Sequence, residues 1–331
     1  MGKHWPPGAP RLPDPGRILE SLERGEIGPA EAFARWRGLD RPPAASMSSH
    51  EPPAPTAPDV LGELDSLIGL AEVKRLVKEI RAFAVIQARR AREGLAAEAT
   101  ALHMIFRGNP GTGKTTVARL LGKILHGAGV LENGHVVEVE RADLVGQYVG
   151  HTAQRTREQI RRASGGILFI DEAYSLARGG DKDFGREAID TLVKAIEDHK
   201  DFIVILAGYR LEMRAFILAN PGLRSRFPLH LDFPDYTGGE LLAIADLMLR
   251  EREYRLDREA HQELAWRFDG QRPREGGPDN AGNARLVRNV IEQAMRRQAC
   301  RLLGQERIGR EDLVTITRAD LGGDGGRCGS V

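Results

Sequence analysis

A glycine-rich run, Gly108-Asn-Pro-Gly-Thr-Gly-Lys-Thr-Thr116, constrains the fold of this chain more than any other stretch. It matches the pattern G-x-x-x-x-G-K-[ST], in which backbone N–H groups of a tight loop surround a phosphate group. In this pattern Lys114 supplies a positive charge for the β- and γ-phosphates, and the Thr115 hydroxyl is a ligand for Mg²⁺. The other predicted phosphate-binding residues of the loop are Pro110, Gly111, Thr112, Gly113 and Thr116.

The residues on both sides of this loop support the same prediction. Leu102–Phe106 is apolar and is typical of a buried strand. After the loop, apolar residues recur at helical spacing, namely Val117, Ala118, Leu120, Leu121, Ile124 and Leu125. The alternative is a chance match in a glycine-rich chain. A strand, the loop and a helix in this order instead place the loop at a helix N-terminus, which favours anions.

Composition limits the class of protein. A chain of 331 residues is long enough for two or three domains, and 41% hydrophobic with 29% charged residues is ordinary for a globular protein. The net charge of +1 provides no overall field toward nucleic acid or a membrane. Two cysteines, Cys300 and Cys328, are too few for a disulfide framework. No signal peptide or long apolar run is visible, so we expect a cytoplasmic protein.

Apolar runs that alternate with helical patterns predict the fold class. The predicted strands are 102–106, 135–139, 167–170, 202–207 and 229–233, with helices starting near Lys114, Thr152, Arg186 and Leu211. This alternation predicts an α/β fold with a parallel five-stranded sheet covered by helices on both faces. After Pro234 the pattern becomes mainly helical, with helices over 241–252, 258–268 and 284–303 and a short strand over 313–317.

The same patterns divide the chain into segments. Residues 1–40 form a tail with a helical hairpin over 17–39, and 41–60 form a linker rich in Pro, Ala and Ser. The nucleotide-binding domain covers 61–235, a small helical domain covers 236–321, and 322–331 form a flexible tail. The hairpin is either a docking or oligomerisation module or part of a partly ordered tail, and its sequence favours neither.

A second run, Gly165-Gly-Ile-Leu-Phe-Ile-Asp-Glu172, places two carboxylates directly after an apolar strand. Open α/β sheets bind ligands at the carboxyl ends of their strands. We predict that Asp171 supports Mg²⁺ and that Glu172 polarises the attacking water. Such a strand can also lead only into a solvated turn, but its position after the phosphate loop favours the catalytic interpretation.

Together these motifs resemble those of AAA+ ATPases. The set, in chain order, is Leu67-Ile-Gly-Leu70, the loop at 108–116, Asp171-Glu172, Asn220-Pro-Gly-Leu-Arg-Ser-Arg-Phe227 and Gly282-Asn-Ala-Arg285. Within this class the chain is similar to the CbxX/CfxQ branch, through the loop at 108–116, residues 142–153 and residues 169–177. Residues 177–193 are more similar to the sporulation members of the branch than to its Rubisco-activating members. The similarity covers about 62–321.

The resemblance implies a homo-oligomeric ring, expected to be a hexamer, with ATP and Mg²⁺ at each interface between subunits. It implies that Arg226 is the arginine finger for the neighbour's γ-phosphate, with Arg224 as a competitor and a local ion pair as the alternative. It also implies that Arg285 is the sensor 2 arginine of a lid domain. Arg288, one turn further along, is an alternative carrier of that role, and a purely structural contact is another.

Three further roles follow from the resemblance. Ile68 and Gly69 would line the adenine pocket, or could equally be core residues. Tyr209 is the nearest candidate for sensor 1, although the stretch Ala207-Gly-Tyr-Arg210 lacks the usual Asn or Thr. Tyr148, Val149 and Gly150 would form the pore loop, in which an aromatic and an aliphatic side chain grip an extended polypeptide. A tyrosine packed on a loop is the alternative.

The resulting functional hypothesis is an ATP-hydrolysing ring that remodels an unidentified protein partner through a central pore, in sporulation. One alternative is removal of inhibitory sugar phosphates from Rubisco. Another is a nucleotide-switched scaffold that does not thread its partner and recruits it through the N-terminal hairpin. A DNA motor is not expected, because the charge is nearly neutral and no DNA-binding motif is visible.

Overall fold

The computed structural model describes residues 57–95, 102–146, 148, 150–178, 184–270 and 282–322. The expected N-terminal hairpin, residues 41–56 of the linker, and residues 323–331 lie outside this part of the chain, as does Val149 of the expected pore loop. Within the described residues, none of the helices combines the length and apolarity needed to cross a membrane.

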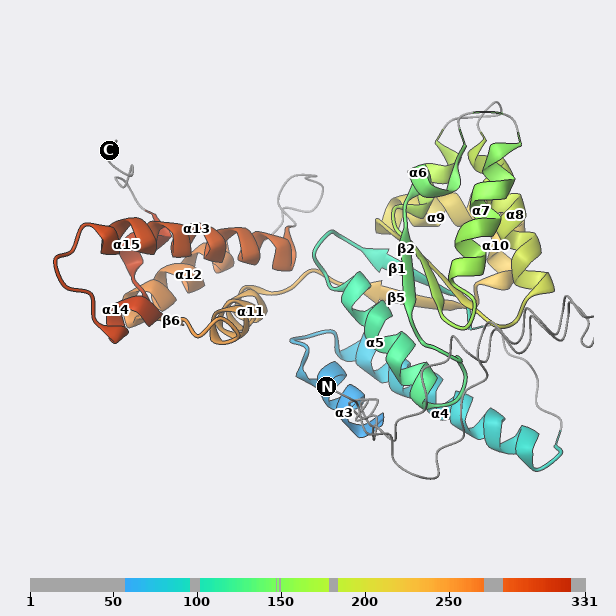
Figure 1. The fold of residues 1–331 in the computed structure, drawn as a ribbon, viewed down its shortest axis with the longest axis horizontal. Coiled ribbons are helices and arrows are strands. Elements are labelled where there is room, and N and C mark those ends of the chain that lie inside the picture. The colour runs from blue at the N-terminus through green and yellow to red at the C-terminus, as the bar shows by residue number, and fades with distance from the viewer. Residues whose placement is uncertain are drawn as a thin grey trace, which may run out of the picture. The chain divides into compact units, whose positions relative to one another are not determined.

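A five-stranded sheet forms the centre of the first domain (Figure 1). Its strands are β1 (Met104–Gly108), β2 (Val136–Val139), β3 (Ile167–Ile170), β4 (Ile203–Gly208) and β5 (Leu229–Phe233). All pairs are parallel, and the order is β2-β3-β4-β1-β5. The predicted parallel sheet is therefore confirmed, with strand ends shifted by up to two residues. Because the strands are parallel, all their carboxyl ends lie at one edge of the sheet.

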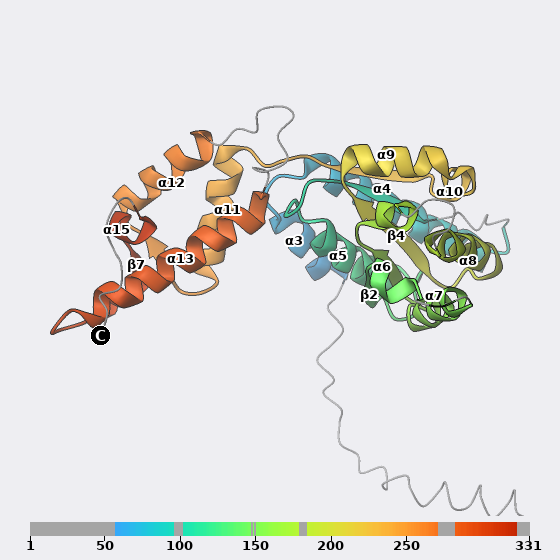
Figure 2. The ribbon, with the colours of Figure 1, turned by 90° about the horizontal axis from the view of Figure 1, so that it is seen from above.

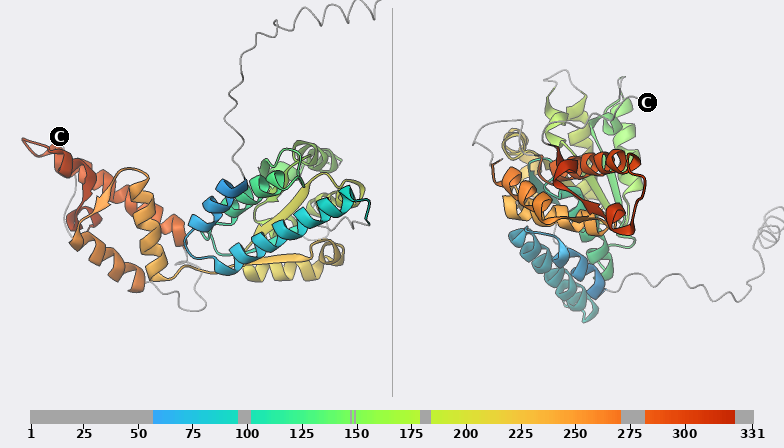
Figure 3. Two further views of the ribbon diagram at one scale, coloured as in Figure 1. Left: turned by 90° about the horizontal axis from the view of Figure 1, so that it is seen from below. Right: turned by 90° about the vertical axis from the view of Figure 1, so that its left-hand side faces the viewer.

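Helices cover both faces of this sheet, as the continuous apolar strands predict. Met104 and Phe106 of β1 belong to one buried cluster, with α3 (Ala57–Ser66), α4 (Ala71–Arg92) and α5 (Lys114–Gly127). Ile105 belongs to a second cluster on the other face, with α7 (His151–Arg162), α8 (Gly185–Asp198) and α9 (Arg210–Ala219). Figure 2 and the left view of Figure 3 show the blue and cyan helices α3 and α4 beside the sheet.

Shorter elements connect these helices to the strands. They are α6 (Arg141–Leu144), the 3₁₀ helix η1 (Ala173–Ala177) and α10 (Pro221–Arg226). Helix α3 begins within the segment that the sequence predicts as linker, and its Val60 and Leu64 are fully buried against the first cluster. The linker prediction is therefore wrong for residues 57–60, where the Pro- and Ala-rich composition masked the start of a short amphipathic helix.

The second domain is mainly helical and has its own apolar cluster. Its helices are α11 (Gly238–Arg250), α12 (Arg258–Gly270), α13 (Asn283–Leu303), α14 (Arg310–Val314) and α15 (Arg318–Leu321). The predicted strand over 313–317 is wrong in its first half, because Leu313 and Val314 end α14, where the Asp312 carboxylate accepts from Gly309 N at 2.9 Å. Only β7 (Thr315–Ile316) is extended, and it pairs with β6 (Arg255–Leu256).

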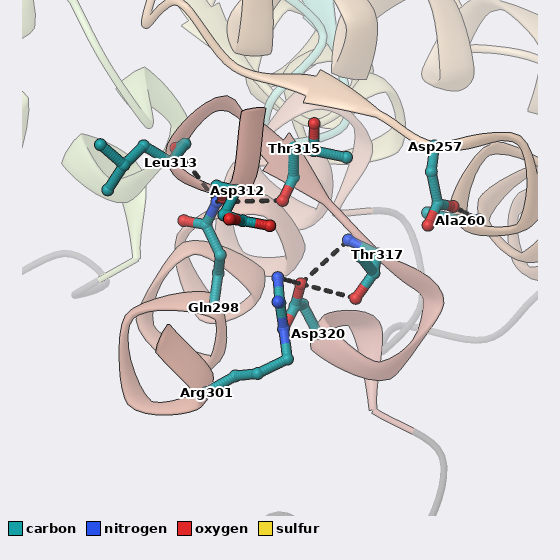
Figure 4. A network of polar contacts seen from close by, with 9 residues as sticks. All are labelled: Asp257, Ala260, Gln298, Arg301, Asp312, Leu313, Thr315, Thr317 and Asp320. Carbon is teal, nitrogen blue, oxygen red and sulfur yellow. Dashed lines mark hydrogen bonds and ion pairs between the residues drawn. The ribbon is translucent and has the colours of Figure 1, made fainter. Parts of the chain in front are cut away.

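Two residues of α13 hold the C-terminal part of this domain in place (Figure 4). Gln298 donates from Nε2 to the carbonyl oxygens of Asp312, Leu313 and Thr315 at 2.9–3.1 Å. Arg301 makes a bidentate pair with Asp320, which is 1% exposed. Burial acts to raise the pKa of Asp320, but hydrogen bonds from Arg301 and Thr317 hold it below its usual value. This buried charge is therefore fully partnered, which fixes α15 on α13.

Candidate active site

The glycine-rich loop follows β1 and passes directly into α5. Gly111 and Gly113 have φ values of 73° and 95°, in the left-handed region that favours glycine. A Cβ on Gly111 would lie 2.5 Å from the carbonyl oxygen of Gly282, so the loop also lies too close to the second domain for a larger residue. Gly113 is the N-cap of α5, and Lys114 is its first residue. The loop thus presents a helix N-terminus, as expected for an anion site.

A cavity of about 260 Å³ brings together the predicted catalytic residues Lys114 and Glu172, but not Arg226. Its lining includes residues from four separate segments, namely Gly108, Pro110, Gly111, Gly113, Lys114, Thr115, Thr116, Asp171, Glu172, Gly208, Tyr209, Ala284, Arg285 and Arg288. Strands β1, β3 and β4 are neighbours in the sheet, so their carboxyl ends deliver these groups to one place. Both sensor 2 candidates, Arg285 and Arg288, line the cavity, and their positions do not favour one over the other.

The charge of Lys114 fits a phosphate group. Its Nζ donates to the carbonyl oxygens of Gly108 and Asn109, both at 2.8 Å. Burial lowers the pKa of Lys114, Asp171 raises it in part, and Arg285 lowers it further. An ammonium group that is half-buried with carbonyl oxygens as partners is stabilised by an anion. Thr115 and Asp171, the predicted Mg²⁺ ligands, line the same cavity and supply the oxygen donors that Mg²⁺ prefers.

Glu172 has a strained backbone. Its φ is 44°, one of few positive values among the non-glycine residues of the described chain. Its N–H donates to Asp171 Oδ1 at 2.9 Å, and its side chain is exposed. Such strain costs roughly 1–3 kcal/mol and often occurs at functional sites. The strain therefore supports a functional role for the side chain that it orients.

Two other predicted nucleotide-binding residues lie beside the second domain. Ile68 packs against the apolar cluster of the second domain. Gly69 has a φ of 65°, and a Cβ there would meet the Glu240 carboxylate. Neither residue lines the cavity, so their role in binding adenine stays a prediction. Thr112 is fully buried, and its hydroxyl donates to Asn109 O at 2.8 Å, so its side chain supports the loop from within.

Sequence reasoning missed a polar network between the loop and the second domain. Asp235 accepts hydrogen bonds from the side-chain amides of Asn109 and Asn283. The Tyr236 hydroxyl donates to Thr112 O at 3.2 Å, and burial raises the pKa of Tyr236 to about 12. Asn109 lies in the motif at 108–116 and Asn283 lies in the motif at 282–285. Their polar side chains next to glycines were the available signal.

Arg226 lies away from this cavity, at the end of α10 and before β5. Its guanidinium pairs with Glu197 of α8 and donates to Gly222 O at 2.7 Å. The start of β5 pairs with the start of β1, so Arg226 lies near the amino edge of the sheet. At about 3.3 Å per residue, the five residues of β5 separate it by about 16 Å from the loop after β1.

The described part of the predicted pore loop is open to solvent. Tyr148 is 67% exposed, and its ring lies 5.5 Å from the His151 ring in an edge-on arrangement. Gly150 has a φ of 81° and is the N-cap of α7. The exposure is compatible with a side chain that faces a pore, and the contact with His151 is compatible with a tyrosine packed on a loop, so the pore-loop role stays a prediction.

Comparison with known proteins identifies the class. Residues 104–235 match the ATPase family associated with various cellular activities (AAA), and residues 237–329 match the AAA lid domain. The chain is 51% identical over 305 residues to "Stage V sporulation protein K" of Bacillus subtilis, covering 92% of both chains. It is 48% identical to "Protein CbxX, plasmid" of Cupriavidus necator, covering 80% of this chain and 83% of that protein.

A further relative extends the same group. "Ribulose bisphosphate carboxylase/oxygenase activase, chloroplastic" of Cyanidioschyzon merolae is 43% identical, covering 80% of this chain and 90% of the relative. The chain therefore belongs to the AAA+ ATPases, in their CbxX/CfxQ branch. Nucleotide binding and ATP hydrolysis are the general activity of this family.

Proposed function

We propose that this chain is one subunit of an ATP-driven ring, expected to be a hexamer, that remodels a protein partner. The observation that carries the proposal is the single cavity lined by the phosphate loop, Asp171, Glu172 and the lid residue Arg285. These groups come from both domains, so nucleotide in the cavity would contact both. This gives hydrolysis a direct way to move the lid.

Each group at the cavity has a distinct role in the proposed reaction. Lys114 leaves the two loop carbonyls and binds the β- and γ-phosphates. Thr115 and Asp171 would hold Mg²⁺, which would offset the negative charge of the phosphates. The Glu172 carboxylate orients a water molecule and accepts its proton as the water attacks the γ-phosphorus. Tyr209, the nearest candidate for sensor 1, lines the same cavity.

Arg226 completes this site from a neighbouring subunit. It lies near the opposite edge of the sheet from Lys114 and does not line the cavity of its own subunit. A guanidinium group at the γ-phosphate stabilises negative charge that develops during transfer. A head-to-tail contact between subunits would bring Arg226 of one subunit to Lys114 of the next, and such contacts form a ring when the rotation between subunits closes.

The partner is proposed to be a protein, gripped at the pore by the exposed Tyr148. The name of the Bacillus subtilis relative favours a role in sporulation. The name of the Cyanidioschyzon merolae relative favours the second candidate, an activase of Rubisco. Stimulation of the ATPase by ribulose bisphosphate would support that second candidate. A cytoplasmic location stays a prediction from the sequence.

The proposed function is tested by the ATPase rate per subunit against protein concentration, with size measurement in the presence of ATP. We expect the rate to rise as rings form and to fall about 10³-fold or more in Arg226→Ala, whose rings still form. Arg224→Ala is the comparison variant, because Arg224 is exposed on the same helix and is the competing candidate, and loss of activity there instead would assign the finger to Arg224. A rate that is independent of concentration and survives Arg226→Ala would mean a self-contained subunit and contradict the proposal.

A further inference from the structure

Three segments that are far apart in the sequence meet at one carboxylate, Asp235. The side-chain amide of Asn109, in the phosphate loop, donates to Asp235 Oδ1 at 3.0 Å and Oδ2 at 2.9 Å. The side-chain amide of Asn283, at the start of α13, donates to Asp235 Oδ1 at 2.8 Å. Asp235 itself follows β5, where the chain passes from the core to the lid. One carboxylate thus joins the loop, the connection between the domains and the lid.

Asn283 fixes the start of the lid helix against the loop. It is 4% exposed and has a φ of 44°, so a costly backbone conformation is held inside the protein. Its amide also reaches Pro110 O at 3.3 Å, and its Oδ1 accepts from the backbone N–H of Tyr236 at 3.0 Å. The next residue, Ala284, donates its N–H to Gly111 O at 3.1 Å. The backbone directly before Arg285 is therefore hydrogen-bonded to the phosphate loop, which fixes where the Arg285 side chain begins.

Asn109 connects this network to the phosphate-binding lysine. Its carbonyl accepts from Lys114 Nζ at 2.8 Å, while its side chain binds Asp235. A phosphate that attracts Lys114 would break the hydrogen bond from Lys114 to the Asn109 carbonyl. Asn109 is also the residue whose side chain binds Asp235, so the change at the lysine reaches the Asp235 network. Without the carboxylate, the side-chain amides of Asn109 and Asn283 would each lose an acceptor at a partly buried place, which is unfavourable.

We propose that Asp235 is a positioning residue that fixes the lid arginine Arg285 relative to the phosphate loop, and so sets the preference for ATP over ADP. The proposal rests on the proposed function, since it assumes that Arg285 contacts the γ-phosphate. Through Asn109 and Asn283, Asp235 determines the distance between the loop and the first turn of α13. Asp235 does not itself line the phosphate cavity.

The test compares the dissociation constants of ATPγS and ADP for the full chain, measured by displacement of a fluorescent nucleotide. In Asp235→Asn the amide cannot accept from both asparagines in the same way. We expect ATPγS to bind about 10- to 100-fold more weakly, with ADP binding changed by less than about threefold. Arg285→Ala should lose the same preference. The double variant should be no worse than Arg285→Ala alone, because both changes remove one interaction.

Asp232→Asn is the matched control. Asp232 lies three residues earlier and makes a bidentate pair with Arg107 at 2.9 Å, but it does not contact the lid in the described chain. We expect it to keep the preference for ATPγS. If Asp235→Asn does not fold, Asn109→Ala tests the proposal instead. This variant removes the hydrogen bonds from Asn109 to Asp235 and leaves the one from Asn283 to Asp235 in place. It should weaken ATPγS binding more than ADP binding.

Equal weakening of ATPγS and ADP, no weakening, or additive effects in the double variant would overturn the role of Asp235. These results are separable from failure of the proposed function. If the unaltered chain binds no nucleotide, the proposed site is wrong. If Arg285→Ala keeps the full preference, Arg285 does not contact the γ-phosphate and the inference about Asp235 falls with it. If Arg285→Ala loses the preference and Asp235→Asn keeps it, only the inference about Asp235 falls.

Discussion

The two edges of the central sheet differ in what they offer. At the carboxyl edge, left-handed glycines, the strained Glu172 and the half-buried Lys114 surround an open cavity. At the amino edge, the His103 ring packs between Phe202 and Phe227, and Arg226 is paired with Glu197. The carboxyl edge offers an open site for a phosphate group, whereas at the amino edge the Arg226 guanidinium is already paired with Glu197. A subunit thus carries both parts of the proposed site but cannot bring them together alone.

The largest expected effect comes from the carboxyl edge. Glu172→Gln keeps the shape of the side chain but removes the base, so we expect ATP turnover to fall about 10²- to 10⁴-fold. Binding of ATP should change little, because Lys114 and the loop are intact. Turnover at a saturating ATP concentration and the dissociation constant of ATP measure the two effects separately. Undiminished turnover would remove Glu172 from the role of base.

Mixing two inactive variants tests whether the edges act between subunits. Lys114→Ala loses the phosphate site, and Arg226→Ala loses the finger, so each alone should have almost no activity. In an equal mixture, some interfaces join an intact Lys114 to an intact Arg226. If subunits mix at random and interfaces act independently, roughly a quarter of the wild-type rate should return. Mixtures that show only the sum of the two separate rates would contradict a shared site.

The carboxyl edge was largely predictable from the sequence. Phosphate loops need glycines and a lysine at fixed spacing, and an apolar strand that ends in Asp171-Glu172 must deliver them to the same edge of a parallel sheet. The five strands and the helices after them follow from alternating apolar patterns. Local periodicity and a fixed motif were enough here.

Contacts between distant segments were not predictable. The Asp235 network joins residues more than a hundred positions apart, and no local pattern links Arg226 to Glu197. The short strand β7 needs its partner β6 to exist, so the apolar run at 313–317 alone gave the wrong start. These features depend on hydrogen bonds between segments that are distant in the sequence, and local sequence patterns carry no information about such pairings.

Acid should affect the amino edge through His103. This side chain is 6% exposed, and its Nδ1 accepts from the Val204 N–H at 3.0 Å. Burial lowers the pKa of His103 to about 4. The folded state therefore keeps the ring neutral while the unfolded chain, with a pKa of about 6.5, takes up a proton as the pH falls. Stability from this group is full above pH 6.5 and is lost toward pH 4, by about 3 kcal/mol.

Urea unfolding at several pH values measures this loss. His103→Asn keeps an oxygen that can accept from Val204 but does not titrate, so this part of the pH dependence should disappear. The variant is expected to be less stable at neutral pH, because it loses ring contacts with Phe202 and Phe227. An unchanged slope between pH 6.5 and 4 in His103→Asn would mean that other groups cause the acid sensitivity.

The smallest expected effect concerns the pair that holds Arg226 at the amino edge. Glu197 is more than half exposed, and such surface ion pairs contribute at most about 1 kcal/mol. The neighbour's triphosphate can therefore displace Glu197, but Glu197 competes with it for the same guanidinium. In Glu197→Gln we expect the protein concentration for half-maximal ATPase rate to fall about two- to fivefold. Asp198→Asn, one residue along the same helix, removes the same charge without touching the pair and should have no such effect.

Combination with Arg226→Ala decides how Glu197 acts. If Glu197 only keeps the finger paired in the free subunit, Glu197→Gln should bring no gain once Arg226 is absent. A lower rate at saturating protein concentration in Glu197→Gln would mean the opposite, that the carboxylate aims the finger at the neighbour's site. In that case the Glu197 pair would orient Arg226 for catalysis before assembly. The amino edge would then be organised for catalysis in the free subunit, as the carboxyl edge is, and the difference between the two edges would disappear.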